Sequence, residues 1–188
     1  MQPINDKSRT PSDLDNHFFL EIRKSVEIGV RDLVSRLDFF ESESLAGLEI
    51  APQDHNILGP LRDLRCRVYS LDIDPGSGAD FIGDICEFNE TISDGQFDFI
   101  ICTEVIEHVS NPQNAVNELM RMTKVGGWLL FTSPFNFRIH GPLPDNWRIS
   151  EWGWRTLLEK HEIVSLEAIE SPGRELFPVH YRVIARRV

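Results

Sequence analysis

The sequence predicts an α/β fold in which helices cover both faces of an open, mostly parallel sheet. The clearest evidence is a central unit in which an apolar strand at Phe97–Thr103, a helical pattern at Pro112–Thr123 and a second apolar strand at Trp128–Thr132 follow one another. Strand, helix and strand in this order form a βαβ unit. Further apolar segments of strand length lie on both sides of this unit, so we expect one sheet built from several such units.

Helical segments are expected before the sheet. Over residues 14–43 the apolar side chains recur near the helical period, with charged residues between them. A break near Ile28–Gly29 would divide this segment into two helices. Residues 14–44 are therefore predicted to form an N-terminal helical cap, and residues 1–13, which lack an apolar signal-peptide core, a disordered lead-in.

Three short strands and a weak helix are predicted between this cap and the central unit. The strands are expected at Gly47–Ala51, Arg67–Ile73 and Ala79–Ile85, and the second of them is followed by a turn at Pro75–Gly78. Residues Asn56–Leu64 carry a weak helical pattern. Each of the three strands would end in a polar loop.

After the central unit the pattern predicts a loop, a helix and two last strands. The loop at 134–149 is rich in Pro, Phe and Arg, and the helix at Ser150–Leu158 would begin at Ser150 as N-cap. The strands are expected at Glu162–Glu170 and Val179–Val188. Residues 45–188 thus form a predicted Rossmann-like core, a doubly wound seven-stranded mixed sheet with an antiparallel last strand, and residues 14–188 a single domain.

Composition and charge exclude several classes of protein. The chain has 188 residues, 41% of them hydrophobic, which suits one domain with one core. A net charge of −11 opposes binding to a nucleic-acid backbone. The basic segment Arg182–Arg187 alternates with apolar residues, so we interpret it as an outer strand of the sheet. No apolar run is long enough to predict a membrane span.

The cysteines indicate a reducing compartment. Cys66, Cys86 and Cys102 show no metal-binding or redox spacing, and their number is odd. They are interpreted as buried, reduced thiols of a cytoplasmic protein. Four histidines carry no partner pattern and are expected to be ordinary surface or packing residues: His17, His55, His161 and His180.

Acidic residues follow the early strands in a pattern compatible with nucleotide binding. Asp72 ends the second strand, 23 positions after Glu49, where a nucleotide-binding βαβ unit places an acid for the ribose hydroxyls. The loop after the first strand reads Ala51–Gln53 and lacks the usual glycines, so a plain strand-to-loop transition explains it equally well. Asp84 ends the third strand, where it would accept a hydrogen bond from a purine amine or cap a turn.

A second group of polar residues follows the fourth and fifth strands. Glu104, Glu107 and His108 form the pattern Glu-x-x-Glu-His, and His140 comes after the next strand. Because neighbouring parallel strands end at the same edge of a sheet, all four are expected to converge. Two carboxylates and two imidazoles suit a divalent ion such as Mg²⁺, Mn²⁺ or Zn²⁺. Without a metal, His108 or His140 is the candidate catalytic base. A bound ion would instead take over this role by lowering the pKa of a hydroxyl.

In their order and spacing these landmarks resemble the class I S-adenosylmethionine-dependent methyltransferases, over residues 45–188. The loop at 134–148 is similar to that of small stand-alone bacterial members. Five pieces carry the resemblance: Leu48–Ile50, Leu71–Ile73, Gly83–Ile85, Phe97–Val109 and Val125–Gly127.

The resemblance implies seven residues that bind S-adenosylmethionine at the ends of the first four strands: Glu49, Ala51, Asp72, Asp84, Ile85, Cys102 and Thr103. Asp72 would bind the ribose hydroxyls, and Asp84 with the backbone of Ile85 would hold adenine. The other four would surround the amino acid and methionine end. Ala51 departs from the family pattern, which has glycine there to let the backbone approach the cofactor.

The resemblance also bears on the metal and on function. The Glu-x-x-Glu-His pattern is similar to that of small-RNA 2′-O-methyltransferases and of O-methyltransferases in ubiquinone synthesis, in which a metal positions the methylated hydroxyl. Metal-free members have Glu-His here as well, with Glu107 as a structural cap and His108 in the pocket. The implied function is methyl transfer from S-adenosylmethionine to an oxygen of a small-molecule or glycan-like acceptor.

Two rival functions follow from the first loop. A methyltransferase fold with an eroded cofactor loop would act as a non-catalytic binding or scaffolding partner, although the retained Asp72, Asp84 and Glu-His pattern argue against this. A nicotinamide-dependent enzyme is disfavoured because the G-x-G-x-x-G turn is absent.

Overall fold

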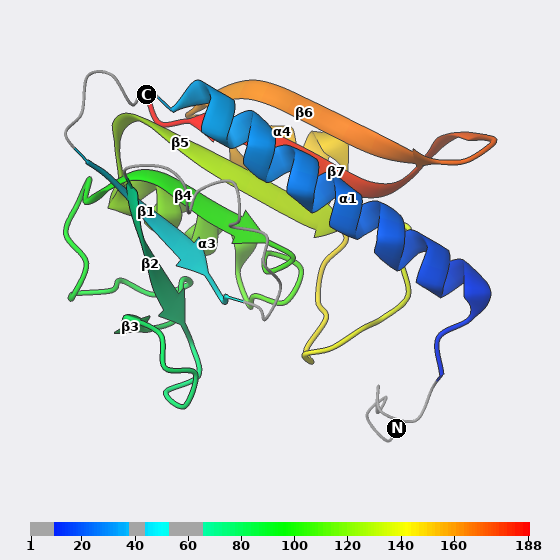
Figure 1. The fold of residues 1–188 in the computed structure, drawn as a ribbon, viewed down its shortest axis with the longest axis horizontal. Coiled ribbons are helices and arrows are strands. Elements are labelled where there is room, and N and C mark those ends of the chain that lie inside the picture. The colour runs from blue at the N-terminus through cyan, green and yellow to red at the C-terminus, as the bar shows by residue number, and fades with distance from the viewer. Residues whose placement is uncertain (1–9, 38–43, 53–65) are drawn as a thin grey trace.

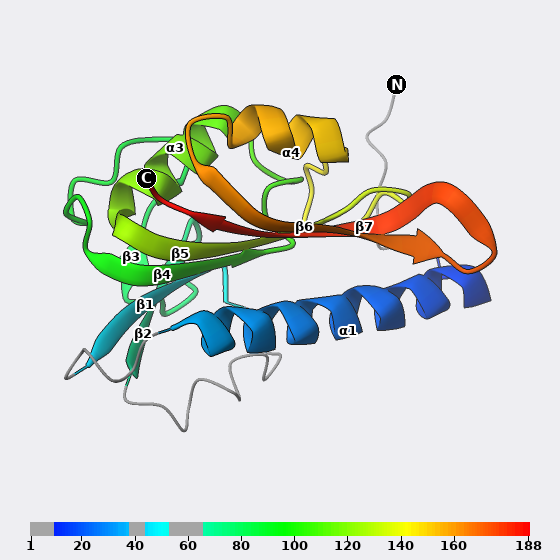
Figure 2. The ribbon, with the colours of Figure 1, turned by 90° about the horizontal axis from the view of Figure 1, so that it is seen from above.

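The computed structural model describes residues 10–37, 44–52 and 66–188. Their elements form a seven-stranded sheet with α1 on one face and α3 and α4 on the other (Figure 1; Figure 2). The helices are α1 (Asp13–Arg36), α3 (Pro112–Met122) and α4 (Glu151–Leu157). The strands are β1 (Leu45–Ile50), β2 (Cys66–Asp72), β3 (Phe81–Ile82), β4 (Phe97–Thr103), β5 (Thr123–Pro134), β6 (Glu162–Ser171) and β7 (Arg174–Arg186).

The strand order is β3-β2-β1-β4-β5-β7-β6. The strands β1 to β5 pair in parallel, whereas β7 pairs antiparallel with both β5 and β6. The predicted doubly wound mixed sheet with an antiparallel last strand is therefore confirmed. The strand order reverses between β1 and β4, and open α/β sheets bind their ligands at the carboxyl ends of the strands on either side of such a reversal.

The place of β7 corrects the prediction for the basic segment Arg182–Arg187. This segment was expected in an outer strand, but β7 lies between β5 and β6, and Val183, Ile184 and Ala185 are fully buried. The guanidinium of Arg182 reaches the Ser25 carbonyl on one face of the sheet. It also forms an ion pair with Glu167 of β6, so its charge is compensated inside the structure.

The helix α1 is continuous, which corrects the predicted break at Ile28–Gly29. Gly29 lies inside the helix and is buried. A Cβ added there would lie only 2.8 Å from Cδ of Arg182 and 2.9 Å from Cδ1 of Leu130, so the contact leaves no room for a larger side chain. The glycine therefore lets α1 approach the sheet closely instead of ending the helix. Ser12 caps the helix and forms a reciprocal capping box with Asp15.

Two other predicted segments differ from the structure. The strand expected at Ala79–Ile85 is reduced to the two residues of β3, because the side chain of Asp84 accepts a hydrogen bond from the backbone of Cys86 and turns the chain. The helix expected at Asn56–Leu64 lies outside the described residues. Most of the predicted lead-in at 1–13 lies outside them as well, although Ser12 and Asp13 already belong to the start of α1.

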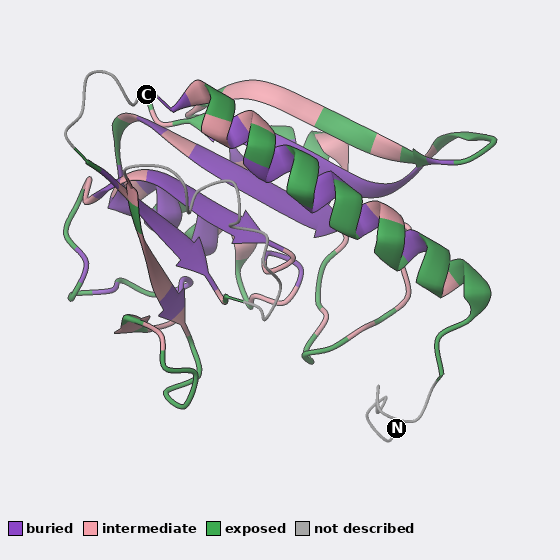
Figure 3. Ribbon diagram, viewed as in Figure 1, coloured by how far each residue is buried: buried purple, intermediate pink, exposed green. Residues whose placement is uncertain are grey.

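The central strands of the sheet are mostly buried, as Figure 3 shows for β4, β5 and β7. One apolar cluster fills the space between the sheet and the helices α3 and α4, with Trp154 against Phe131 at its centre. A second cluster lies between the sheet and α1 and contains Leu33, Phe99 and Ile184. Each of these side chains stabilises the fold by roughly 1.5–3 kcal/mol through burial. Among the helices described here, none is both long and apolar enough to cross a lipid bilayer.

Candidate active site at the carboxyl ends of the strands

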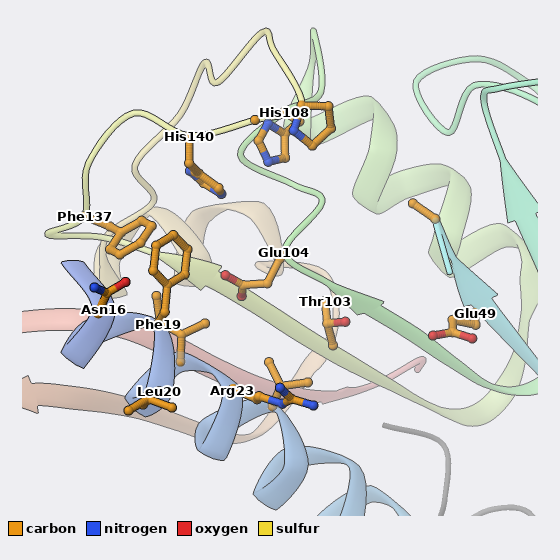
Figure 4. Close-up of a pocket in the computed structure, with 15 residues that line it drawn as sticks. Asn16, Phe19, Leu20, Arg23, Glu49, Thr103, Glu104, His108, Phe137 and His140 are labelled. Carbon is orange, nitrogen blue, oxygen red and sulfur yellow. The ribbon is translucent and has the colours of Figure 1, made fainter. Parts of the chain in front are cut away.

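A cavity of about 520 Å³ lies at the ends of β1 and β4, between α1 and the loop that follows β5 (Figure 4). This volume is in the range of small-molecule sites. Its described lining comes from three places, namely α1, the ends of β1 and β4, and the loop after β5: Asn16, Phe19, Leu20, Ile22, Arg23 and Val26; Glu49, Ala51, Thr103, Glu104 and His108; and Phe137, His140, Gly141 and Pro142.

The end of β1 contributes two predicted cofactor-binding residues to this cavity. Ala51 has a φ of 49°, in the left-handed region that favours glycine, and its N–H donates to the carbonyl of Leu71 over 2.8 Å. Its backbone thus has the shape that a glycine would give this loop. Glu49 is buried, with 7% of its surface exposed, and burial raises the pKa of its carboxyl to about 7.

The end of β4 contributes Thr103, which is buried and lines the cavity beside Glu104. Cys102 precedes it and points into the apolar core on the α3 side. Burial, together with the charges of Glu107 and Glu104, raises the pKa of the Cys102 thiol well above its ordinary value. Only the backbone of Cys102 can therefore serve the site, which is the role that the sequence resemblance implies.

The predicted ribose and adenine residues lie at the same edge but outside the described lining of the cavity. Asp72 ends β2, and its Oδ1 atom accepts the N–H of Asp74 over 2.8 Å. Asp84 accepts the N–H of Cys86 in the same manner, and Ile85 is buried in the core. Both acids thus cap turns through Oδ1, and a carboxylate has a second oxygen that can accept from another partner.

A second group of residues meets at the rim of the cavity. The Nε2 atoms of His108 and His140 lie 3.7 Å and 3.6 Å from Oε1 of Glu107, and the two imidazole rings are 4.9 Å apart. One ligand atom from each of the three side chains lies within 4.8 Å of the others. In the part of the chain that the structure describes, this is the group of His, Cys, Asp and Glu side chains that could hold a metal ion.

The loop after β5 fixes the orientation of both imidazole rings. The Nδ1 atom of His108 lies 2.9 Å from the carbonyl oxygen of Pro144, and Nδ1 of His140 lies 3.0 Å from Oδ2 of Asp145. Since a carbonyl and a carboxylate can only accept, both Nδ1 atoms carry the ring proton, and both Nε2 lone pairs face Glu107. Arg148 in turn holds Asp145, with Nη2 at 2.7 Å from Oδ2.

The electrostatics of this group follow from its burial. Glu107 is fully buried, and burial raises the pKa of its carboxyl to about 7. Neither of its oxygens has a hydrogen-bond partner among the described residues. Burial lowers the pKa of His108, whereas for His140 the neighbouring Glu107 and Asp145 outweigh burial and raise the pKa. Burying a carboxyl group without a hydrogen-bond partner is unfavourable in free energy, so Glu107 is a candidate for binding a proton donor or a cation.

Glu104 does not join the other three, although the sequence predicted a group of four. Its Oε1 atom accepts from Oγ1 of Thr132 over 2.8 Å and lies 2.7 Å from Nε2 of His180. Burial would raise the pKa of Glu104, but the interactions with His180 and Thr132 outweigh it and lower the pKa. Its φ of 56° is in the left-handed region, which is strained for a glutamate.

His180 was expected to be a surface or packing residue without a partner, and the structure shows a buried residue that has two polar partners. His180 is fully buried and bonds Glu104 on one side and Ser25 on the other. The sequence offered one signal, a histidine in an apolar segment, but its partners come from β4 and α1 and cannot be inferred from spacing. The wall that α1 builds with Phe19 and Arg23 was missed for the same reason (Figure 4).

Known proteins with similar sequences carry out O-methylation. An O-methyltransferase of ubiquinone biosynthesis from Burkholderia vietnamiensis is 26% identical over 120 residues, which are 64% of this chain and 48% of that protein. The enzyme of the same name from Thiobacillus denitrificans is 41% identical over 39 residues, 21% of this chain and 17% of that protein. The chain thus matches less than half the length of these curated relatives.

Solved structures share the fold at low sequence identity. A SAM-dependent methyltransferase from Aquifex aeolicus superposes with a TM-score of 0.59 at 18% identity, over 90% of this chain and 98% of that chain. The CurJ carbon methyltransferase superposes with a TM-score of 0.65 at 15% identity, over 94% of this chain and 58% of that chain. At these identities the likeness concerns the fold and leaves the acceptor open.

The family model described as a methyltransferase domain matches residues 22–171. This match covers most of the chain and includes the ends of β1, β4 and β5 that build the cavity. Membership implies S-adenosylmethionine as the methyl donor. The chain belongs to the class I S-adenosylmethionine-dependent methyltransferases.

Proposed function

We propose that the protein transfers the methyl group of S-adenosylmethionine to an oxygen of a small-molecule or glycan-like acceptor. The observation that carries this proposal is the group Glu107, His108 and His140 at the rim of the cavity, with both Nε2 lone pairs turned toward a buried carboxyl. Such a group can take a proton from a hydroxyl, as methyl transfer to oxygen requires. The similarity to O-methyltransferases of ubiquinone biosynthesis supports the same acceptor atom.

The cavity suits the methyl donor at its β1 end. The left-handed backbone at Ala51 lets the loop approach a ligand as a glycine would, and Thr103 forms the opposite wall. Asp72 would hold the ribose hydroxyls, and Asp84 with Ile85 the adenine, at the ends of β2 and β3. When bound, S-adenosylmethionine supplies an electrophilic methyl group, and the task of the protein is to align the acceptor oxygen with it.

We assign the proton transfer to His140. Its Nδ1 proton is held by Asp145, so the Nε2 atom, which faces Glu107 at the rim of the cavity, has a lone pair without a proton. Asp145 also fixes the ring by accepting the backbone N–H of His140 over 2.9 Å. A carboxylate that orients a histidine and stabilises its protonated form is the arrangement of a general base. His108 has the same tautomer, but its Nδ1 partner is the neutral carbonyl of Pro144, so it is the weaker base.

The same three side chains fit a divalent metal. The donor set has one carboxylate and two imidazoles, the Nδ1 atoms are anchored by Pro144 and Asp145, and both oxygens of Glu107 lack a partner among the described residues. We propose that Glu107, His108 and His140 hold this ion, with Mn²⁺ or Zn²⁺ favoured over Mg²⁺ because two of the three donors are nitrogens. A metal there would use the Nε2 lone pair of His140, so the ion would then replace His140 as the activating group by lowering the pKa of an acceptor hydroxyl.

The proposal is tested by methyl transfer from labelled S-adenosylmethionine to a panel of catechols and monosaccharides. The protein is first treated with a chelator and then assayed with and without Mn²⁺, Zn²⁺ and Mg²⁺. We expect transfer to at least one hydroxylated acceptor, with loss of about a hundredfold or more in kcat for His140→Ala. The matched control is His161→Ala, remote from the cavity, which should keep the wild-type rate. Binding of S-adenosylhomocysteine without transfer to any acceptor would favour the non-catalytic alternative.

A further inference from the structure

We propose that His180 is a positioning residue for Glu104, and that Ser25 of α1 and Thr132 of β5 complete this arrangement. The inference rests on the proposed function, because it assigns Glu104 to the acceptor side of the same cavity. His180 is fully buried and does not line the cavity, so it acts only through Glu104. The residues come from four different elements or loops, which the topology brings together at the carboxyl edge of the sheet.

The direction of these hydrogen bonds follows from the carboxylate of Glu104, which can only accept. The Nε2 atom of His180 therefore carries a ring proton and donates to Oε1 of Glu104 over 2.7 Å. In the neutral ring Nδ1 then has a lone pair and accepts the hydroxyl proton of Ser25, whose Oγ is 3.0 Å away. The same Oγ accepts from Nη1 of Arg182 over 3.3 Å, which a hydroxyl with two lone pairs can do while it donates.

Thr132 donates the second hydrogen bond to Oε1 of Glu104. Its hydroxyl donates to the same oxygen over 2.8 Å, so both lone pairs of Oε1 are occupied. Glu104 lines the cavity, and Figure 4 places its carboxylate between His140 and Thr103. Oε2 is therefore the oxygen that remains for a ligand in the cavity. We assign it the role of accepting a hydrogen bond from the acceptor, next to the base His140.

The backbone of Glu104 shows that this placement is imposed by its surroundings. Its φ of 56° is unfavourable for a residue with a Cβ, and its N–H donates to the carbonyl of Thr132 over 3.1 Å. A strained backbone conformation is kept only where several neighbouring contacts hold it in place, and such residues are concentrated in active sites. In this protein β5 holds the backbone and His180 holds the carboxylate.

The chain of bonds also connects the carboxylate to α1. Ser25 lies on the buried face of α1, and the same helix contributes Phe19, Leu20 and Arg23 to the cavity wall. The docking of α1 therefore does two things at once: it closes the cavity and supplies the hydroxyl that orders the imidazole of His180. A substitution of Ser25 that weakens the packing of α1 is expected to impair the alignment of the acceptor, although Ser25 itself does not line the cavity.

The proposal is tested by kinetics on four variants, with the best acceptor of the panel above. His180→Leu removes the donor to Glu104 and should lower kcat about tenfold or more, with KM for S-adenosylmethionine nearly unchanged. His180→Gln can place an N–H near the position of Nε2 and should restore most of the lost rate. His161→Leu is the control for loss of a histidine elsewhere. Ser25→Ala should fall between wild type and His180→Leu.

A double-mutant cycle distinguishes positioning from a general loss of stability. If His180 acts through Glu104, then His180→Leu should add little to the effect of Glu104→Gln on kcat, because the shared interaction is already lost. Additive effects, or equal losses for His180→Gln and His180→Leu that track their melting temperatures, would overturn the proposal. Binding of S-adenosylhomocysteine is measured for each variant and should stay within about threefold of wild type.

A spectroscopic readout keeps this inference separate from the proposed function. In a ¹H–¹⁵N spectrum of protein labelled at histidine, we expect His180 to be the tautomer protonated at Nε2, with a signal that shifts in the Glu104→Gln variant. A His180 ring protonated only at Nδ1 would overturn the proposal, whatever the enzyme activity. Absence of turnover in the wild type would contradict the proposed function, and the tautomer alone would then decide whether His180 holds Glu104.

Discussion

Oε1 of Glu107 lies 3.6 Å from Nε2 of His140, a distance too long for a hydrogen bond and short enough for a shared ligand. The carboxyl is fully buried, and neither of its oxygens is bonded by the residues that the structure describes. The imidazole offers a lone pair, because its proton is on Nδ1 beside Asp145. Two acceptors that face each other in a buried site need a proton or a cation between them.

The first prediction concerns that cation. Addition of Mn²⁺ or Zn²⁺ to chelator-treated protein should raise the melting temperature by about 5 °C or more, since a ligand at about 100 times its Kd stabilises the native state by about 2.7 kcal/mol. The shift is measured by scanning calorimetry. His140→Ala should abolish most of it, and Glu104→Gln should keep most of it, because Glu104 is bonded to His180 and Thr132 instead. An unchanged melting temperature at millimolar metal would contradict the site.

The second prediction concerns the pH dependence of stability. Burial raises the pKa of Glu49 from 4.5 to about 7, so between these values the native state holds a proton that the unfolded state has lost. Stability from this group is full below pH 4.5 and is lost as the pH rises through about 7. The loss is at most about 3–4 kcal/mol, because each pKa unit corresponds to about 1.36 kcal/mol. Urea unfolding over this range should show it, and Glu49→Gln should flatten the curve. A variant with an unchanged slope would show that Glu49 titrates normally.

The third prediction concerns the loop after β1. The left-handed backbone at Ala51 costs about 1–2 kcal/mol for a residue with a Cβ, and a β-branched side chain makes the conformation worse. Ala51→Gly should therefore keep or raise the melting temperature, because relief of this strain offsets the entropy cost of glycine, and it should retain or improve the affinity for S-adenosylhomocysteine. Ala51→Val should lower both. Equal affinities for the three proteins, measured by calorimetric titration, would mean that the loop does not approach the cofactor.

The sequence was sufficient for the elements whose pattern is local. The apolar run Phe97–Thr103 became β4 with the predicted bounds, and Ser150 is the N-cap of α4. Because parallel strands end at one edge, topology alone also placed His140 near Glu107 and His108. The order of the strands was harder to predict, since it depends on packing between distant segments. For this reason the basic segment of β7 was assigned to an outer strand although it lies inside the sheet.

Side-chain partners across the fold could not be predicted from the sequence. Glu104 is bonded to His180, 76 positions away, and to Thr132, and only the register of β5 with β7 brings these residues together. Gly29 suggested a break in α1, whereas its missing side chain makes room for Leu130 and Arg182. In both cases the decisive contact is a tertiary one, and local propensity carries no information about it.

Titration of the protein with S-adenosylhomocysteine in a calorimeter tests the central claim most directly. We predict binding by the wild-type protein, and at least a tenfold loss of affinity for Asp72→Ala, because a carboxylate bonded to two ribose hydroxyls gains roughly 1.5–3 kcal/mol from each charged hydrogen bond. Asp84→Ala should lose less, since water can replace a single amine contact. A wild-type protein that shows no heat of binding at millimolar ligand would contradict the assignment of this cavity to methyl transfer.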